Sequence, residues 1–336
     1  MKKILKKIYN GTYLNELESY TLFKSIFNKE INDMQIASIL AILSSRTETY
    51  EEIIGARTFL AQHIQSFPKS NNIISDIVGT GGDQQNSFNI STVSAIVAAC
   101  YGIKIAKICN IGSSSQLGSA NLLQQLNINI NITPEQSRQC LDEMNICFLL
   151  ANKYLGIFNT VSKIRSSLQI KTIFNILGPL LNPAQPTHAL IGVYKPQLML
   201  IYAKILSRLP YKRVIIVHSG GIDEATLHSN TTVVELKNKK IKKYILSPED
   251  FGLKKHHKIY ITKKSKIENY LETIKLFKGQ GEPIYTQTIA INVSLLMKVL
   301  GNNDIRKNTL DILNFINTGQ VYKFVVKLSQ LCKLFN

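Results

Sequence analysis

The sequence is poor in cysteine and has no apolar run long enough to cross a membrane. Its five cysteines form no CxxC pair, so neither a zinc site nor a disulfide framework is indicated. A membrane helix needs roughly 18 to 20 apolar residues, and lysines such as Lys104, Lys107 and Lys195 interrupt the most apolar stretches. The basic N-terminus is followed by polar residues and not by the apolar segment of a signal peptide. We therefore expect a cytoplasmic protein with no membrane partner.

Acidic residues are also scarce, since 22 Asp and Glu stand against 40 Lys and Arg and leave a formal net charge of +18. Such an excess suits nucleic acid, an acidic substrate or a lysine-rich solvated surface. The basic residues are spread along the chain, and the densest run, Lys237 to Lys243, lies near a predicted hairpin. We favour the solvated surface and do not expect a nucleic-acid partner.

The order of apolar residues predicts two kinds of structure. From Asn15 to about Phe67 they recur at helical spacing, with Asn32 or Asp33 as a cap. From Asn72 short apolar runs alternate with helical stretches, as in βαβ units, and helices return from Thr286. We predict an α/β fold class, with a small all-helical domain plus a larger α/β domain that has a mostly parallel central sheet. Its strands are expected at Ile73 to Val78, Ile103 to Cys109, Ile146 to Leu150, Ala189 to Val193 and Val214 to His218, with two or three more between Thr232 and Ile261.

A glycine-rich loop, Gly79 to Asp83, directly follows the first predicted strand, and Asn89 to Thr92 opens the next helix. Glycines let the backbone turn sharply and bring its N–H groups close to an anion, and a helix N-terminus favours a phosphate. Taken alone, the pattern also suits a tight turn before a capped helix. It matches neither the P-loop nor the GxGxxG spacing.

A second polar loop, Lys107 to Ser119, begins at the end of the second predicted strand. Because adjacent parallel strands end at the same sheet edge, both loops should face one crevice. Lys107 would supply positive charge there, and the serines would donate hydrogen bonds to a polyanion. A serine-rich loop by itself is more often only a solvated loop.

Two adjacent carboxylates, Asp223 and Glu224, follow a predicted strand end and a glycine turn. Such a pair suits Mg²⁺, which takes oxygen ligands and reaches the phosphates of a substrate. Without the two loops it would also be typical of a solvated turn.

Taken in order along the chain, these motifs are similar to those of the anthranilate phosphoribosyltransferases. The matching blocks are Gly79 to Asp83, Asn89 to Thr92, Lys107 to Ser119, Arg165 with Lys171 to Pro183, and His218 to Glu224. The resemblance implies an enzyme of tryptophan biosynthesis that transfers the 5-phosphoribosyl group from phosphoribosyl pyrophosphate to the amine of anthranilate. It also implies two Mg²⁺ ions, a homodimer, a helical domain over residues 1–70 joined by helices from about 155–185, and an α/β domain over residues 71–336.

The resemblance assigns site residues but no catalytic acid or base. For anthranilate it implies Gly79, Asn110 and Arg165, whose planar fork matches a carboxylate, and for the metal it implies Ser91, Asp223 and Glu224. The residues implied for phosphoribosyl pyrophosphate are Gly79, Gly82, Asp83, Ser87, Asn89, Ile90, Ser91, Thr92, Lys107, Asn110, Gly112, Ser113, Ser114, Ser115 and Ser119. The Phe174 to Pro183 block is expected to be structural, with Gly178 and Pro179 ending a helix.

The acceptor loop departs from the family pattern Lys-His-Gly-Asn-Arg. Ile108, Cys109 and Ile111 stand in place of the histidine, glycine and arginine, and Leu155 takes the place of a second histidine. The donor half is therefore better preserved than the acceptor half. Two alternatives stay open at this point: a pyrimidine nucleoside phosphorylase, which uses phosphate, and a basic relative that has lost catalysis and binds nucleic acid with a steep salt dependence.

Overall fold

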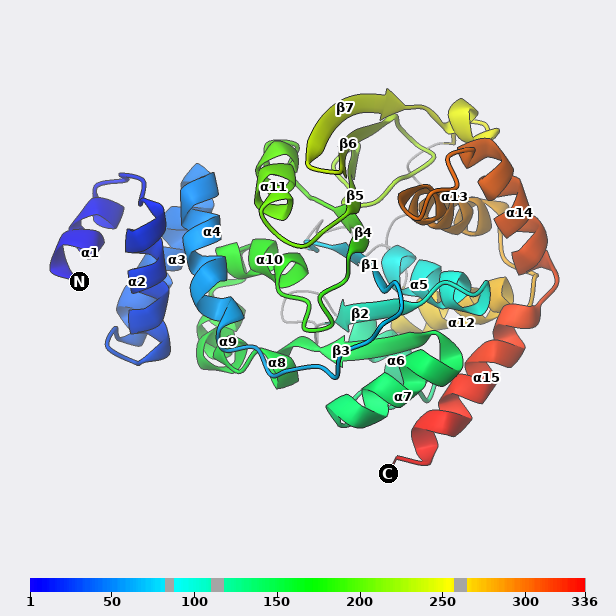
Figure 1. The fold of residues 1–336 in the computed structure, drawn as a ribbon, viewed down its shortest axis with the longest axis horizontal. Helices are drawn as coiled ribbons and strands as arrows, with labels where there is room; N and C mark the ends of the chain where they lie inside the picture. The colour runs from blue at the N-terminus through cyan, green and yellow to red at the C-terminus, as the bar shows by residue number, and fades with distance from the viewer. Residues whose placement is uncertain (82–87, 110–117, 257–264, 336) are drawn as a thin grey trace. The chain divides into compact units, whose positions relative to one another are not determined.

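The computed structural model describes residues 1–81, 88–109, 118–256 and 265–335 (Figure 1). The chain forms two compact units. The first comprises Met1–Ser66 and Ala151–Pro183, and the second comprises Phe67–Leu150 and Ala184–Asn336. Over the described ranges, none of the helices has the length and apolar character that crossing a membrane demands.

The first unit is helical, as predicted. Asn32 caps its third helix with a capping box, which confirms the predicted start, and equivalent boxes at Asn15 and Thr49 begin the helices on either side. The first helix was not predicted, because only Ile4 and Ile8 of its eight residues are buried. The elements are α1 (Lys2–Tyr9), α2 (Glu16–Phe27), α3 (Asp33–Arg46), α4 (Tyr50–Ala61), α8 (Ala151–Tyr154), α9 (Ile157–Leu168), α10 (Ile173–Leu177) and the 3₁₀ turn η1 (Gly178–Leu180).

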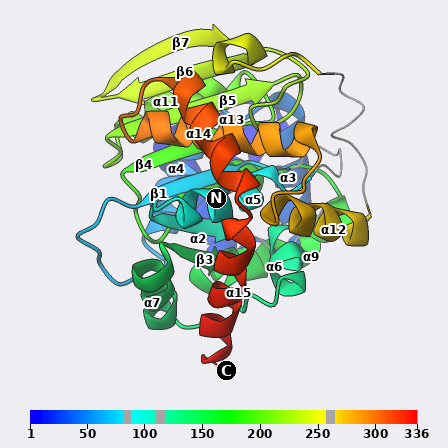
Figure 2. The same cartoon turned by 90° about the vertical axis from the view of Figure 1, so that its right-hand side faces the viewer.

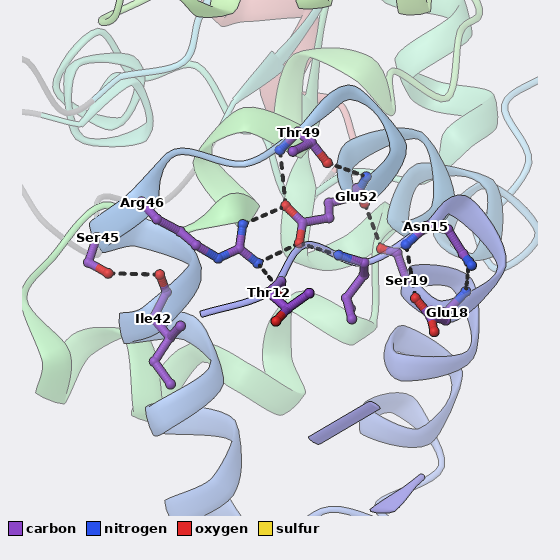
Figure 3. Close-up of polar contacts among 10 residues, drawn as sticks. Thr12, Asn15, Glu18, Ser19, Ile42, Ser45, Arg46, Thr49 and Glu52 are labelled. Carbon is purple, nitrogen blue, oxygen red and sulfur yellow. Dashed lines mark hydrogen bonds and ion pairs between the residues drawn. The ribbon is translucent and has the colours of Figure 1, made fainter. Parts of the chain in front are cut away.

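A buried carboxylate ties the helices of this unit together at the start of α4. Figure 3 shows Glu52 between the guanidinium of Arg46 and the main chain of Thr49. Arg46 Nη1 and Nη2 donate to Glu52 Oε2 and Oε1 at 2.9 and 2.5 Å, and the N–H groups of Thr49 and Leu14 each donate at 3.0 Å. One side chain therefore satisfies four donors that come from three segments.

The second unit contains a seven-stranded sheet in the order β3-β2-β1-β4-β5-β6-β7. The strands from β3 to β5 run parallel, and β6 and β7 form an antiparallel hairpin at one edge. The mostly parallel sheet and the hairpin near the lysine run are confirmed. The strands are β1 (Ser75–Gly79), β2 (Ile105–Cys109), β3 (Ile146–Leu150), β4 (His188–Gly192), β5 (Arg213–Ser219), β6 (Thr231–Lys237) and β7 (Lys240–Leu246).

Helices cover both faces of this sheet. α11 packs on β5 and β6, whereas α13 packs on β4 and β5 from the other face, and α5 packs on β1 (Figures 1 and 2). α5 and α13 are buried almost all round, and most of their residues are apolar. The helical elements are α5 (Ile90–Cys100), α6 (Ser119–Gln125), α7 (Pro134–Met144), α11 (Leu198–Ser207), η2 (Pro248–Phe251), α12 (Lys266–Phe277), α13 (Pro283–Val299), α14 (Ile305–Asn317) and α15 (Gln320–Lys333).

The register of the sheet decides what meets at its carboxyl edge. Gly79, the last residue of β1, pairs with Gly192, the last residue of β4, and Gly192 pairs with Val217 of β5. The chain segments that leave β1, β4 and β5 therefore start side by side. Ligands of open α/β sheets bind at this edge.

Candidate active site

Two glycines allow Asp223 to lie against the ends of β1 and β4. A Cβ atom built on Gly79 would lie 2.2 Å from Asp223 Oδ2, and one built on Gly192 would lie 1.3 Å from the main-chain oxygen of Asp223. The N–H group of Gly81 donates to Asp223 Oδ2 at 2.7 Å. The predicted glycine-rich loop and the predicted metal pair are thus in direct contact.

The N-terminus of α5 meets the same pair of carboxylates. Ser91 Oγ donates to Glu224 Oε1 at 3.1 Å, and Thr92 Oγ1 donates to Ser119 Oγ at 2.9 Å. Asp223 is buried and Glu224 is half-buried. The structure therefore brings together Gly79, Ser91, Thr92, Ser119, Asp223 and Glu224, which the sequence places on four separate segments.

Asn89 occupies the position before α5, but its side chain makes no capping hydrogen bond to the helix. Its Oδ1 accepts a hydrogen bond from Asn269 Nδ2 of α12. An amide that accepts through its oxygen presents its NH₂ group as a donor on the other side. Asn269 was not predicted as part of the site.

Lys107 points into the sheet and not towards solvent. Its side chain is buried, and Nζ donates to the main-chain oxygen of Ile77 in β1 at 2.5 Å. Burial lowers the pKa of Lys107, while the negative charges of Asp76, Glu224 and Asp223 act in the opposite direction. We infer that its ammonium group balances the buried acids at the sheet edge.

A second asparagine, Asn292 of α13, holds the segment that follows the metal pair. Its Nδ2 donates to the main-chain oxygen of Ala225 at 2.8 Å, and the Ala225 N–H donates to its Oδ1 at 3.2 Å. One feature of the sequence could have identified Asn292, because it is the single asparagine inside the apolar stretch Ile289 to Leu296. Nothing in that stretch identifies the segment that it holds.

Arg165 belongs to the helical unit, where two aromatic rings surround it. Its Cζ lies 5.8 and 5.5 Å from the ring centroids of Phe158 and Phe174, and its Nη2 donates to Asn175 Oδ1 at 3.3 Å. Burial lowers the pKa of the Arg165 guanidinium to about 10, so it stays charged at pH 7. The predicted end of the neighbouring helix is confirmed, since α10 ends at Leu177 and Gly178 opens a 3₁₀ turn.

Three of the residues that depart from the family pattern are buried. Ile108 and Leu155 are two of them. Cys109 is also buried, its Sγ donates to the main-chain oxygen of Leu149, and burial raises the pKa of its thiol to about 12. Cys109 is therefore protonated at neutral pH and has no nucleophilic character. The other predicted residues, Gly82, Asp83, Ser87, Asn110, Ile111, Gly112, Ser113, Ser114 and Ser115, lie outside the described residues.

The residues at the sheet edge fit a magnesium ion. Two oxygens that share an octahedral Mg²⁺ at about 2.1 Å lie about 3 Å apart, close to the 3.1 Å between Ser91 Oγ and Glu224 Oε1. Within the described residues no cluster of three or more His, Cys, Asp or Glu side chains could hold a metal. Two carboxylates and a hydroxyl leave positions for water and substrate oxygens, as is usual for Mg²⁺.

Protein-family comparisons agree with this fold. The a/b domain of a glycosyl transferase family matches residues 71–322, and the helical bundle domain of that family matches residues 2–64. The chain is therefore a glycosyltransferase built from both parts of this family.

Individual relatives specify the branch of the family. The chain is 49% identical over 330 residues to the anthranilate phosphoribosyltransferase of Buchnera aphidicola subsp. Baizongia pistaciae (strain Bp), with 98% of this chain and 100% of the relative covered. It is 47% identical over 333 residues to that of Buchnera aphidicola subsp. Schizaphis graminum (strain Sg), with 99% of each covered.

Solved structures of the same enzyme are also similar. The anthranilate phosphoribosyltransferase of Thermus thermophilus superposes with a TM-score of 0.88 at 29% identity, covering 98% of this chain and 99% of that chain. The enzyme from Saccharomyces cerevisiae, solved in complex with PRPP and Mg, gives 0.87 at 26% identity, covering 99% and 97%. The chain belongs to the anthranilate phosphoribosyltransferase family, and the resemblance seen in the motifs is confirmed.

Proposed function

We propose that this protein transfers the 5-phosphoribosyl group of phosphoribosyl pyrophosphate to the amine of anthranilate and releases pyrophosphate, as a step of tryptophan biosynthesis. The bond from the ribosyl C1 to pyrophosphate breaks, a C1–N bond forms, and the amine releases a proton. The supporting observation is the contact of Ser91 with Glu224, because it joins a helix N-terminus suited to phosphate with a carboxylate pair suited to Mg²⁺.

The donor half of the site positions the pyrophosphate. We assign its phosphates to the Gly79 to Thr92 segment and to the loop that ends at Ser119, with the buried Lys107 contributing positive charge without a direct contact. When bound, Mg²⁺ supplies positive charge that offsets the charge developing on the leaving pyrophosphate. We propose two ions, as the family resemblance implies, with Asp223 and Glu224, which contact the Gly81 main chain and Ser91 respectively, as the carboxylate ligands.

The acceptor half relies on Arg165, Asn110 and Gly79. A guanidinium that is half-buried, charged and close to two aromatic rings suits the carboxylate of an aromatic acid. The amine of anthranilate is neutral at pH 7, so its lone pair is free and no general base is assigned. The relative from Saccharomyces cerevisiae was solved in complex with 4-fluoroanthranilate.

We also propose that the enzyme is a cytoplasmic homodimer that associates through its helical domain, placed at residues 1–70 with helices from about 155–185. Leu17 and Met34 of this domain are 73% and 83% exposed, which suits a surface that a second copy covers. Light scattering on the wild type and on Met34→Lys tests this, and a wild type that is monomeric at micromolar concentration contradicts it.

One assay tests the activity directly. Purified protein is mixed with phosphoribosyl pyrophosphate, Mg²⁺ and anthranilate, and the loss of anthranilate fluorescence is followed together with pyrophosphate release. We expect equal amounts of anthranilate consumed and pyrophosphate released, and no turnover after chelation of Mg²⁺. Turnover of a nucleoside with phosphate in the absence of Mg²⁺ would instead support a nucleoside phosphorylase.

A further inference from the structure

The side chain of Asn292 forms a two-point clamp on the main chain of Ala225. Its Oδ1 accepts from the Ala225 N–H at 3.2 Å, and its Nδ2 donates to the Ala225 carbonyl at 2.8 Å and to the Thr288 carbonyl at 2.8 Å. Asn292 is 1% exposed, and Ala225 is fully buried. Water therefore does not compete for these main-chain groups, and buried main-chain N–H and carbonyl groups need partners.

The clamped residue directly follows Asp223 and Glu224. On its other side, the segment is held by a two-way main-chain bridge between Ser219 and Ile222. A contact of Ser219 Oγ with Thr226 Oγ1 at 2.7 Å closes the turn from one side of the pair to the other. The two carboxylates thus lie on a short turn that is fixed at both ends. α13 supplies one of these fixed points, although Asn292 lies 67 residues beyond Ala225 in the sequence.

We propose that Asn292 is a positioning residue for the metal-binding turn, which sets the affinity for Mg²⁺ without touching the metal or either substrate. The inference rests on the proposed function, since it takes Asp223 and Glu224 as the metal pair. Only an amide of this length offers the donor and the acceptor that the clamp uses. A carboxylate cannot donate to the Ala225 carbonyl, and an alkyl group can do neither.

The test compares Asn292→Ala and Asn292→Asp with a matched control, Asn308→Ala. Asn308 is a buried helix asparagine, 4% exposed, whose Nδ2 donates to the main-chain oxygen of Asn302 at 2.7 Å, and it lies in neither half of the site. Loss of a residue that orients metal ligands typically weakens metal affinity by about 10- to 100-fold. We expect that range for both Asn292 variants and less than about threefold for the control.

Metal binding is measured without turnover, by electron paramagnetic resonance of Mn²⁺ titrated into protein that contains inorganic pyrophosphate. Hydrogen exchange of peptides spanning residues 222–228, in metal-free protein, should be faster in both variants and unchanged in Asn308→Ala. Wild-type Mn²⁺ affinity in Asn292→Asp, with the protein folded, would overturn the proposal. Where Asn292→Ala does not fold, Asn292→Asp decides, because it has almost the same shape.

These readouts separate the clamp from the proposed reaction. A wild-type protein that binds Mn²⁺ and pyrophosphate but does not consume anthranilate contradicts the acceptor assignment and leaves the clamp supported. A wild-type protein that is fully active while Asn292→Asp keeps its Mn²⁺ affinity and its exchange rates contradicts the clamp alone.

Discussion

Gly192 lies directly against the main-chain carbonyl of Asp223, so that a Cβ atom on Gly192 would come within 1.3 Å of that oxygen. The contact joins the last residue of β4 to the turn that carries the metal pair. Gly79, its partner at the end of β1, faces the carboxylate of the same aspartate. The position of Asp223 therefore depends on two neighbouring strands that both end in glycine.

Gly192→Ala should disrupt the site. The atom that a new methyl group would meet is main chain, which cannot rotate away, and overpacking of this kind costs about 1–3 kcal/mol or more. We expect a lower thermal midpoint and a marked loss of Mg²⁺-dependent pyrophosphate release. Gly156→Ala is the control, because a methyl group there meets no atom within 4 Å. Wild-type Mg²⁺ dependence in Gly192→Ala would contradict this account of the turn.

Ser91→Ala tests the metal assignment on the other side of the turn. Removing Oγ deletes the contact with Glu224 and one oxygen ligand, so the apparent Mg²⁺ requirement should rise by at least about tenfold. The KM for anthranilate should stay near its wild-type value. Ser94→Ala is the matched control, since Ser94 lies one turn further along α5, fully buried, with no partner for its hydroxyl among the described residues. Equal effects of the two substitutions on the Mg²⁺ requirement would exclude a specific role for Ser91.

The fold could be predicted because its strands are short apolar runs that end in glycine or polar loops. β3 was predicted at its observed bounds, Ile146–Leu150, and the other parallel strands within one or two residues. Helix α1 was missed because its charged residues outnumber the apolar ones that it buries, Ile4 and Ile8. Its helical form depends on packing within the helical unit, which the local pattern does not contain.

The candidate site was predicted unevenly, for a physical reason. Motifs next to strand ends, such as Asp223 with Glu224, carry their chemistry in consecutive residues and can be recognised. Gly192, Asn269 and Asn292 act through tertiary contacts. Their partners lie 31, 180 and 67 residues away in the sequence, respectively. Lys107 was expected to face the ligand, but its position in a buried strand turns its ammonium group to the main chain of β1.

Arg165→Ala should raise the KM for anthranilate more than the KM for phosphoribosyl pyrophosphate. A hydrogen bond to a charged group is worth about 1.5–3 kcal/mol, or roughly 10- to 150-fold in KM. Arg165→Lys keeps the charge but loses the planar fork, so it should recover only part of the affinity. Steady-state kinetics with each substrate varied in turn give the two constants. Equal increases in both would count against the acceptor assignment.

Glu52→Gln should destabilise the helical unit without acting on the chemistry. Glu52 is buried, and the substitution removes the charge that pairs with Arg46 and one of the acceptors for the N–H groups of Thr49 and Leu14. Breaking a buried ion pair costs about 3–5 kcal/mol of unfolding free energy. Because the Arg46 side chain is 13% exposed, we expect a loss near the lower end, about 3 kcal/mol. Glu18→Gln removes a more exposed pair with Lys7 and should cost less than about 1 kcal/mol. Urea unfolding measures both. Because neither residue is assigned to the donor or the acceptor half of the site, KM values below the transition should match the wild type. A Glu52→Gln loss no larger than that of Glu18→Gln would show that the network in Figure 3 contributes little to stability.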